Sequence, residues 1–85
     1  MTLTYDDVLT ARAAIADATL LTPTVPATRL SLQLGIDLHL KLENLQHTNA
    51  FKARGALAKL LSLTDEERRA GVIACSAGNH AQGVA

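Results

Sequence analysis

The sequence predicts an α/β fold, and three observations support this class. Residues 5–18 and 52–63 space their apolar side chains every three or four positions, as amphipathic helices do. Residues 38–42 lie between these stretches and alternate leucine with polar side chains, as a half-buried strand does. A short apolar run at residues 72–75 precedes a further helical pattern. Helices that alternate with short strands are typical of α/β proteins.

The first predicted element is the helix over residues 5–18. Thr4 and Asp7 have the spacing of a capping box, in which each side chain binds the backbone N–H group of the other residue. Pro23 and Pro26 follow the helical pattern and disfavour helix at the residues before them. The chain is therefore predicted to be extended around these prolines.

The middle of the chain is predicted to hold a short helix and the half-buried strand at residues 38–42. The short helix begins at Thr28 or Arg29, and Gly35 ends it. A polar loop at residues 44–49 is expected after the strand, because its side chains cannot continue the apolar alternation.

Two further helices are predicted before the apolar run. The first follows the polar loop, with Asn49 as its cap, and continues to about Leu63. Thr64 and Glu67 form a second capping box, which begins a short charged helix. Gly71 is expected to end that helix.

The last residues predict that the chain is part of a larger protein. Residues 72–75 are expected to form a buried strand, and residues 79–85 the first turns of a helix. A buried parallel strand needs neighbouring strands on both sides. We therefore expect the 85 residues to be the N-terminal part of a longer chain.

Charge and composition limit the possible functions. Eight basic side chains balance eight acidic ones, which is not the basic surface typical of nucleic-acid or anionic-membrane binding. No apolar stretch is long enough to span a bilayer, and the N-terminus lacks the pattern of a signal peptide. The single cysteine, Cys75, excludes an internal disulfide and indicates a reducing compartment, so we expect a cytoplasmic protein.

Lys52 is the strongest candidate for chemistry. It follows the only phenylalanine, Phe51, and begins a helical pattern directly after a polar loop. Lysine amines form Schiff bases when burial, or the positive end of a helix, favours their neutral form. A lysine at such a position is more commonly solvated, so the residue alone leaves both interpretations open.

Residues 76–80, Ser76-Ala77-Gly78-Asn79-His80, form the second candidate site. They lie between the predicted strand and the last helix. Such a junction presents unpaired backbone N–H groups, and small residues let a ligand approach closely, so it can bind an anion. The commoner alternative is an ordinary turn in which Ser76 or Asn79 caps the helix.

Other reactive side chains carry no recognisable site. Cys75 is expected to be a small buried strand residue rather than a nucleophile paired with His80. His39 and His47 lack the spacing of metal ligands, so no metal site is predicted. Glu43 is a possible general base by residue type alone.

Residues 40–56, LKLENLQHTNAFKARGA, and residues 74–85, ACSAGNHAQGVA, together resemble the tryptophan-synthase-β-like (fold type II) pyridoxal-phosphate enzymes, in particular the threonine dehydratase and serine racemase group. The resemblance runs in register over nearly the whole chain. It implies an open, parallel-type sheet with flanking helices. Residues 1–71 would belong to the large cofactor-binding domain, and residues 72–85 would begin a smaller, truncated domain.

The resemblance also implies roles for single residues. Lys52 binds the cofactor, pyridoxal 5′-phosphate, through a Schiff base and moves the Cα proton of the substrate. Phe51, a core residue by default, packs on the cofactor ring. Residues 76–80 bind the substrate carboxylate, and Asn79 donates a hydrogen bond to the phenolic oxygen of the cofactor. Arg54, otherwise a surface ion-pair partner, has a structural role near the site.

The implied reaction is that of an ammonia-lyase acting on a small hydroxy amino acid. L-Threonine would give 2-oxobutanoate and ammonia, and L-serine would give pyruvate. Ala77 stands where racemases of the group have serine, which favours a dehydratase. Asn49 and Ala50 stand where the family has Gly-Ser, which leaves the substrate open and keeps hydroxyaspartate as an alternative.

Two alternatives remain at the level of the whole chain. It can be a truncated, non-catalytic interaction module, or a sister lyase or racemase of the same fold. The phosphate-binding loop of the family would lie beyond Ala85, so we expect the 85-residue piece alone to be inactive. The full-length enzyme is expected to form a homo-oligomer.

Overall fold

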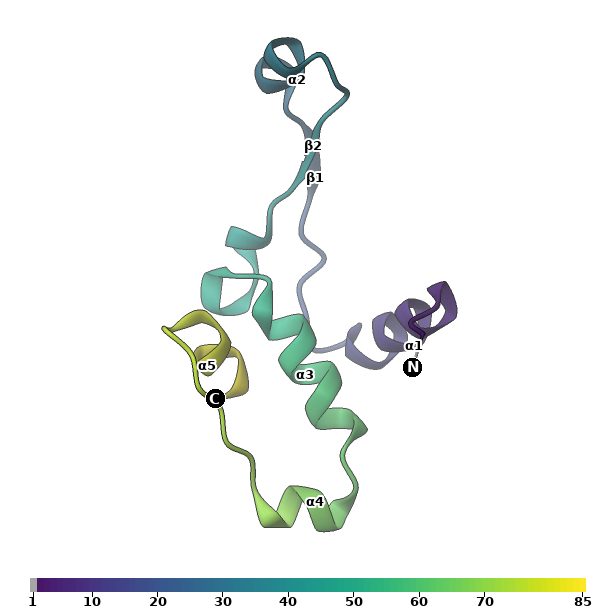
Figure 1. Cartoon of the computed structure of the whole chain (residues 1–85), viewed down its shortest axis with the longest axis vertical. Helices are drawn as coiled ribbons and strands as arrows, with labels where there is room; N and C mark the ends of the chain where they lie inside the picture. The colour runs from purple at the N-terminus through teal and green to yellow at the C-terminus, as the bar shows by residue number, and fades with distance from the viewer. Residues whose placement is uncertain (1) are drawn as a thin grey trace.

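The computed structural model describes residues 2–85. Helices and short strands alternate as far as β2, as the sequence predicts, and only helices follow in the described residues (Figure 1). The elements are α1 (Tyr5–Ile15), β1 (Thr24–Pro26), α2 (Thr28–Leu34), β2 (His39–Lys41), the 3-10 helices η1 (Glu43–Leu45) and η2 (His47–Asn49), α3 (Lys52–Ser62), α4 (Asp65–Ala70) and α5 (Asn79–Val84).

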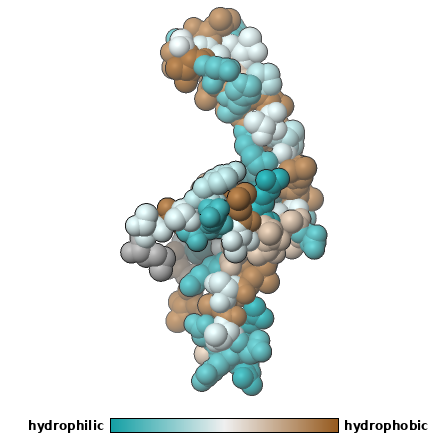
Figure 2. Space-filling view, turned by 90° about the vertical axis from the view of Figure 1, so that its right-hand side faces the viewer, coloured by the Kyte–Doolittle hydropathy of each residue, from teal (hydrophilic) through white to brown (hydrophobic). Residues whose placement is uncertain are grey.

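The described residues form an elongated body rather than a closed domain. In Figure 1, α3 lies in the middle between α1 and α5, and the β1–α2–β2 arm extends away from it. The radius of gyration is 15.9 Å, against about 12 Å for a compact chain of this length. Ile15 and Ala56 are the buried apolar residues of a very small core. Apolar side chains therefore lie on the surface of both the arm and the body (Figure 2).

Both predicted capping boxes are present. Thr4 and Asp7 exchange side chain to backbone hydrogen bonds at the start of α1, and Thr64 and Glu67 do so at the start of α4. The predicted length of the first helix is wrong, since α1 ends at Ile15 rather than at residue 18. The backbone N–H groups of residues 18 and 19 both bind the carbonyl oxygen of Ile15 at 3.1 Å. This tight turn ends the helix three residues early.

The arm is a two-stranded antiparallel ribbon with α2 at its tip. Val25 pairs with Leu40, and Gly35 ends α2 in the left-handed conformation that the sequence predicts. The predicted half-burial of residues 38–42 is confirmed only at the two ends, where Leu38 and Leu42 are half-buried. Leu40 is 41% exposed, and β1 and β2 themselves are exposed. Among the described residues no second layer of side chains packs on this ribbon, so Leu40 in the middle of the strand stays exposed.

The predicted buried strand at residues 72–75 is also absent. This segment is extended but pairs with no other described strand, and Ile73 and Cys75 are exposed. A strand is stabilised by hydrogen bonds to its neighbours, and these 84 described residues supply none beside it. The expectation that Cys75 is buried is wrong for the same reason.

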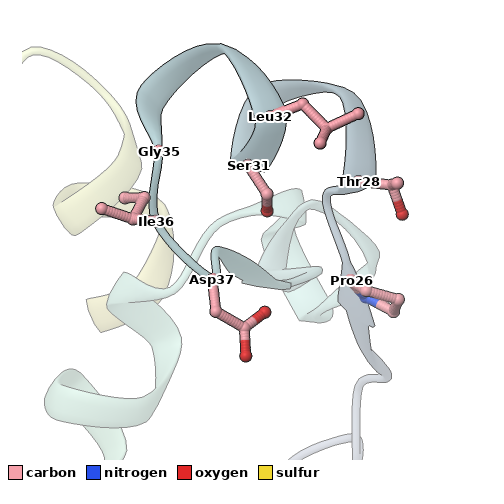
Figure 3. Close-up of a pocket in the computed structure, with 7 residues that line it drawn as sticks. All are labelled: Pro26, Thr28, Ser31, Leu32, Gly35, Ile36 and Asp37. Atoms are coloured by element: carbon pink, nitrogen blue, oxygen red, sulfur yellow. The ribbon is translucent and has the colours of Figure 1, made fainter.

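The helices are short. Within residues 2–85, none is both long and apolar enough to cross a membrane. A cavity of about 500 Å³ lies at the tip of the arm (Figure 3). It is lined by Pro26, Thr28, Ser31, Leu32, Gly35, Ile36 and Asp37. It contains none of the predicted site residues and lies at the far end of the arm from α3.

Candidate active site

Lys52 is the first residue of α3, and its side chain is exposed. The predicted cap at Asn49 is wrong. Phe51 is the N-cap residue and makes no capping hydrogen bond with its side chain. The Asn49 amide group donates instead to the carbonyl oxygen of Asn44 at 2.9 Å. The loop therefore folds back on itself, and no side chain caps the N–H groups of the first helical turn.

Phe51 and Lys52 face the same open region. The Lys52 Nζ atom lies 5.2 Å from the centre of the Phe51 ring, a distance at which a cation and an aromatic ring attract each other. Phe51 is 61% exposed, so the default expectation of a core residue is wrong. An exposed aromatic ring beside an exposed amine leaves room for a planar ligand between this turn and its surroundings.

Helix α5 packs against the start of α3, beside Lys52 (Figure 1). Gly83 makes the closest approach. A Cβ atom at Gly83 would lie 3.3 Å from the Ala53 N and Cα atoms and 3.3 Å from the Lys52 carbonyl carbon. Glycine lets the two backbones come this close, and any larger residue would crowd them. The structure thus places the helix that begins with Asn79 against the turn that carries Lys52, although 27 positions separate these two residues in the sequence.

The loop before α5 is held by its own serine. The Ser76 Oγ atom accepts hydrogen bonds from the N–H groups of Gly78 at 3.2 Å and Ala81 at 2.9 Å. Ala77 and Asn79 are exposed. The N-cap residue of α5 is Gly78, so the predicted cap at Ser76 or Asn79 is wrong in position. Ser76 still binds an N–H group of the first helical turn from outside the helix, and this arrangement does not test whether the loop also binds a carboxylate.

His80 lies on the side of α5 that faces α3. It lines a groove of about 300 Å³ together with apolar residues of both helices, among them Ala56, Leu60 and Val84. It is half-buried, whereas Cys75 is exposed. No group of three histidine, cysteine or acidic side chains within residues 2–85 is arranged to hold a metal ion.

A cluster of polar side chains that the sequence does not reveal supports α3 on another side. We call Thr22, Glu43 and Arg54 the Glu43 cluster. The Glu43 Oε1 atom lies 2.8 Å from Arg54 Nε, 2.7 Å from Arg54 Nη2 and 3.0 Å from Thr22 Oγ1. The Lys41 ammonium group is 3.9 Å from the same oxygen. The ion-pair role expected for Arg54 is therefore present, and its partner is a largely buried carboxylate rather than a surface one.

Gln46 fixes the loop beside this cluster. Its side chain is the most deeply buried in the described chain, at 2% exposure. Its amide oxygen accepts from the Leu20 N–H group and its amide nitrogen donates to the Leu20 carbonyl oxygen, both at 2.9 Å. This two-point contact ties the loop that precedes Lys52 to the segment after α1. Sequence patterns give no signal for it, because a glutamine in a polar loop is ordinarily solvated.

The pKa of Glu43 is lowered from its ordinary value. The main cause is the hydrogen bond from Arg54; hydrogen bonds from Thr22 and Gln46 add to it, and desolvation opposes it. Glu43 is thus held as a carboxylate, which suits a structural anion better than the general base that its residue type suggests. A base needs a pKa near the working pH.

The model of the family of pyridoxal-phosphate dependent enzymes matches residues 15–85. The chain belongs to this family. Catabolic L-threonine dehydratase of Escherichia coli is 48% identical over 79 residues, which are 93% of this chain and 24% of that protein. L-threo-3-hydroxyaspartate ammonia-lyase of Saccharomyces cerevisiae is 45% identical over 82 residues, 96% of this chain and 25% of that protein. The chain therefore spans about a quarter of the length of these relatives.

A solved structure confirms the fold. Maize serine racemase superposes with a TM-score of 0.84 at 36% identity, over 99% of this chain and 26% of that one. The predicted membership of the fold type II pyridoxal-phosphate enzymes and the predicted fold class are both confirmed. The only sheet that the described residues form is the antiparallel ribbon, so the parallel-type sheet of the fold is not built from them. The domain boundary after residue 71 stays a prediction.

The cofactor of the family is pyridoxal 5′-phosphate, as predicted. The residues of this chain fit it. An exposed primary amine stands at the start of α3 with an aromatic ring beside it, and the uncapped first turn is open to a ligand. Lys52, Phe51 and Asn79 are the residues predicted to hold the cofactor, and the structure places all three at the contact between α3 and α5 or next to it.

The ion pair between Glu43 and Arg54 predicts a pH dependence of stability. Because the pKa of Glu43 is lower in the folded state, its ionised form stabilises the fold above its ordinary pKa of 4.5. This stability is lost as the pH falls through the folded-state pKa. The melting temperature of the full-length protein should exceed that of Glu43→Gln at neutral pH, and the difference should shrink below pH 4.5. A difference that stays constant through the acid range would contradict this assignment.

The loop before Lys52 contains backbone strain. Thr48 and Asn49 have φ angles of 63° and 57°, and a β-branched residue in this region costs on the order of 1–3 kcal/mol. Replacing Thr48 by glycine should therefore raise the free energy of unfolding of the full-length protein by about 1 kcal/mol, after the entropic cost of glycine is subtracted. Urea denaturation measures this change.

Thr10→Gly is the matched control for this substitution. Thr10 lies inside α1, where glycine should lower the free energy of unfolding by up to about 1 kcal/mol. Equal destabilisation by both substitutions would show that the Thr48 conformation is not strained.

Proposed function

We propose that the chain is the lysine-bearing part of a full-length pyridoxal-phosphate-dependent ammonia-lyase that acts on a small hydroxy amino acid, L-threonine first. The observation that carries the proposal is the exposed Lys52 amine at the uncapped start of α3, with α5 packed beside it. The names of two relatives support it, since one is an L-threonine dehydratase and the other an L-threo-3-hydroxyaspartate ammonia-lyase.

The residues of this chain have separate tasks in the proposed reaction. Lys52 Nζ binds the cofactor covalently and, as a free amine, accepts the Cα proton of the substrate. When bound, the cofactor supplies an electron sink for the charge that develops at Cα. Phe51 packs on the ring of the cofactor, and Asn79 orients it. The N–H groups of residues 76–80 bind the substrate carboxylate.

The net reaction converts L-threonine to 2-oxobutanoate and ammonia. The β-hydroxyl group leaves as water, and hydrolysis of the resulting enamine, through its imine tautomer, consumes one water and releases ammonia. The same steps convert L-serine to pyruvate. No separate oxidant or reductant is needed, because the carbon skeleton is unchanged and the oxidation of Cα is balanced by the reduction of Cβ in the same molecule.

Two features of the site bear on the substrate. Ala77 has no group that exchanges a proton, which favours a lyase over a racemase although maize serine racemase shares the fold. Asn49 stands where the family has glycine. Its φ angle of 57° explains why this position takes one of these two residues. Asparagine and glycine are the residues that best tolerate this conformation. The departure at Asn49 therefore preserves the loop, and Ala50 is the change that removes a hydroxyl group near the ligands.

The test is turnover by the full-length protein with bound cofactor. L-Threonine, L-serine and threo-3-hydroxyaspartate are supplied separately, and the 2-oxo acid and ammonia are measured together with the optical rotation of the remaining substrate. Equal amounts of 2-oxobutanoate and ammonia from L-threonine support the proposal. If the protein converts only hydroxyaspartate, the proposed substrate is wrong. If the remaining substrate is racemised and no ammonia is released, the protein is a racemase and not a lyase.

A non-catalytic module is the alternative from a different class. The elongated shape and exposed apolar surface of residues 2–85 are compatible with it. We expect the 85 residues alone to be inactive, because they do not contain the phosphate-binding loop of the family. Our proposal for the whole protein includes a cytoplasmic homo-oligomer in which residues 1–71 belong to the large domain.

A further inference from the structure

We infer that Glu43 and Arg54 form a positioning pair that fixes the helical turn carrying Lys52. This inference rests on the proposed function, because it concerns how the reactive amine is aimed. It extends the site to two side chains that touch neither substrate nor cofactor. It also gives the Glu43 cluster a role in rate as well as in stability.

The first step is the position of Arg54 relative to Lys52. Both lie in the first turn of α3, two positions apart, so their side chains leave the helix roughly 200° from each other. Arg54 therefore holds the turn from the side opposite to Lys52. Its guanidinium group uses both Nε and Nη2 on the Glu43 Oε1 atom, at 2.8 Å and 2.7 Å. Nη2 also donates to the Leu20 carbonyl oxygen at 3.1 Å.

The second step is that Glu43 is itself immobilised. Its side chain is 15% exposed and lies at the start of η1. Thr22, which is 5% exposed, donates to the same carboxylate oxygen at 3.0 Å. Thr22 and Leu20 belong to the segment that Gln46 ties to the loop. The guanidinium group thus docks on a carboxylate that two chain segments, residues 20–22 and 43–46, hold in place.

The third step is that the start of α3 has little other support. Its N-cap residue, Phe51, is exposed and makes no capping hydrogen bond with its side chain. Thr48 and Asn49, three and two residues before Phe51, have the left-handed backbone conformation. Gly83, a residue of α5, packs against the backbone of Lys52 and Ala53 in this turn. The ion pair on one side and the Gly83 contact on the other are therefore what prevents the turn from shifting. A displacement of about 1 Å at a reacting group costs on the order of 100-fold in rate.

The test uses the full-length protein with cofactor and two substitutions that keep size. Arg54→Lys keeps the charge but loses the planar fork, and Glu43→Gln keeps the shape but loses the charge. We expect each to lower kcat by about 10- to 100-fold, with KM changed less than about threefold. Amide hydrogen exchange of residues 50–56 in the cofactor-free protein should become faster, because the turn is released.

Arg68→Lys is the matched control. Arg68 lies 3.7 Å from Asp65 on α4, and its Nε and Nη2 groups donate to the carbonyl oxygens of Leu60 and Leu61 near the C-terminal end of α3. This variant therefore loses the planar guanidinium group at the end of α3 that is remote from Lys52, and it should keep kcat, KM and the exchange rates of residues 50–56. If Glu43→Gln and Arg54→Lys lower the melting temperature while kcat of the folded protein and exchange at residues 50–56 stay as in the wild type, the pair is only structural and the inference is wrong.

A milder substitution keeps the inference testable if the Glu43→Gln and Arg54→Lys variants fail to fold. Thr22→Val keeps the volume of Thr22 and the ion pair but removes one hydrogen bond to Glu43. It should lower kcat and speed exchange to an intermediate extent, and unchanged values would overturn the inference. The exchange readout does not depend on turnover. A wild type that converts no hydroxy amino acid would refute the proposed function while still showing whether the pair holds the turn.

Discussion

Replacing Lys52 by alanine in the full-length protein is expected to lower kcat by at least about 1,000-fold. The substitution removes both the covalent attachment of the cofactor and the group that accepts the Cα proton, and proton transfer alone contributes about 100- to 10,000-fold. The Lys52 side chain is exposed and makes no hydrogen bond among the residues that the structure describes, so the fold should tolerate the change. Steady-state turnover and thermal melting measure the two quantities separately.

Covalent labelling locates the cofactor directly. Borohydride treatment of the wild-type holoenzyme should attach the cofactor to the peptide that contains Lys52, and mass mapping should find no label in Lys52→Ala. Lys59→Ala is the matched control, because Lys59 is an exposed lysine on the same helix, two turns further along. It should keep the label and kcat. A label on any other lysine of the full-length chain would contradict the assignment of Lys52.

Replacing Gly83 by valine should lower kcat by about 100-fold, and Gly83→Ala by about 10-fold. A Cβ atom at this position meets backbone atoms of Lys52 and Ala53 at 3.3 Å, closer than ordinary van der Waals contact. Backbone atoms cannot rotate away, so α5 must move relative to α3. That movement separates Asn79 and the loop before it from Lys52. The cost in stability should be about 1–3 kcal/mol for valine.

Gly55→Ala is the matched control for the Gly83 substitutions. Gly55 also lies in a helix, but a Cβ atom there meets no described atom within 4 Å. Its replacement should leave kcat unchanged and raise the free energy of unfolding by about 0.5–1 kcal/mol, because alanine favours helix more than glycine does. If Gly83→Val keeps the wild-type kcat, the contact between α3 and α5 does not position Lys52.

Local structure was predictable from sequence where neighbouring residues decide it. The capping boxes at Thr4 and Thr64 and the left-handed Gly35 each depend on residues within one helical turn. The helix that begins at Lys52 follows from its own apolar period. The cap predicted at Asn49 failed because its side chain found a nearer partner in its own loop.

Burial was not predictable in the same way. Leu40 in β2 and the apolar residues 72–75 belong to patterns of half-buried and fully buried strands, yet they are exposed in the described chain, and only Leu38 and Leu42 beside β2 are half-buried. An apolar pattern predicts which side of a segment favours burial. Whether that side is buried depends on the other segments that pack against it in the folded protein.

The sequence by itself determined the family and its cofactor, because these are encoded in motifs of consecutive residues. The same motifs predict Lys52 as the reactive amine, and the labelling experiment above tests that prediction. Only the tertiary structure assigned roles to Glu43, Gln46 and Gly83. Each acts on a partner at least 11 positions away, on Arg54, Leu20 and Lys52 respectively. A hydrogen bond to a distant backbone group, or a close backbone contact at a glycine, forms only when the segments pack together. A local sequence pattern therefore cannot predict it.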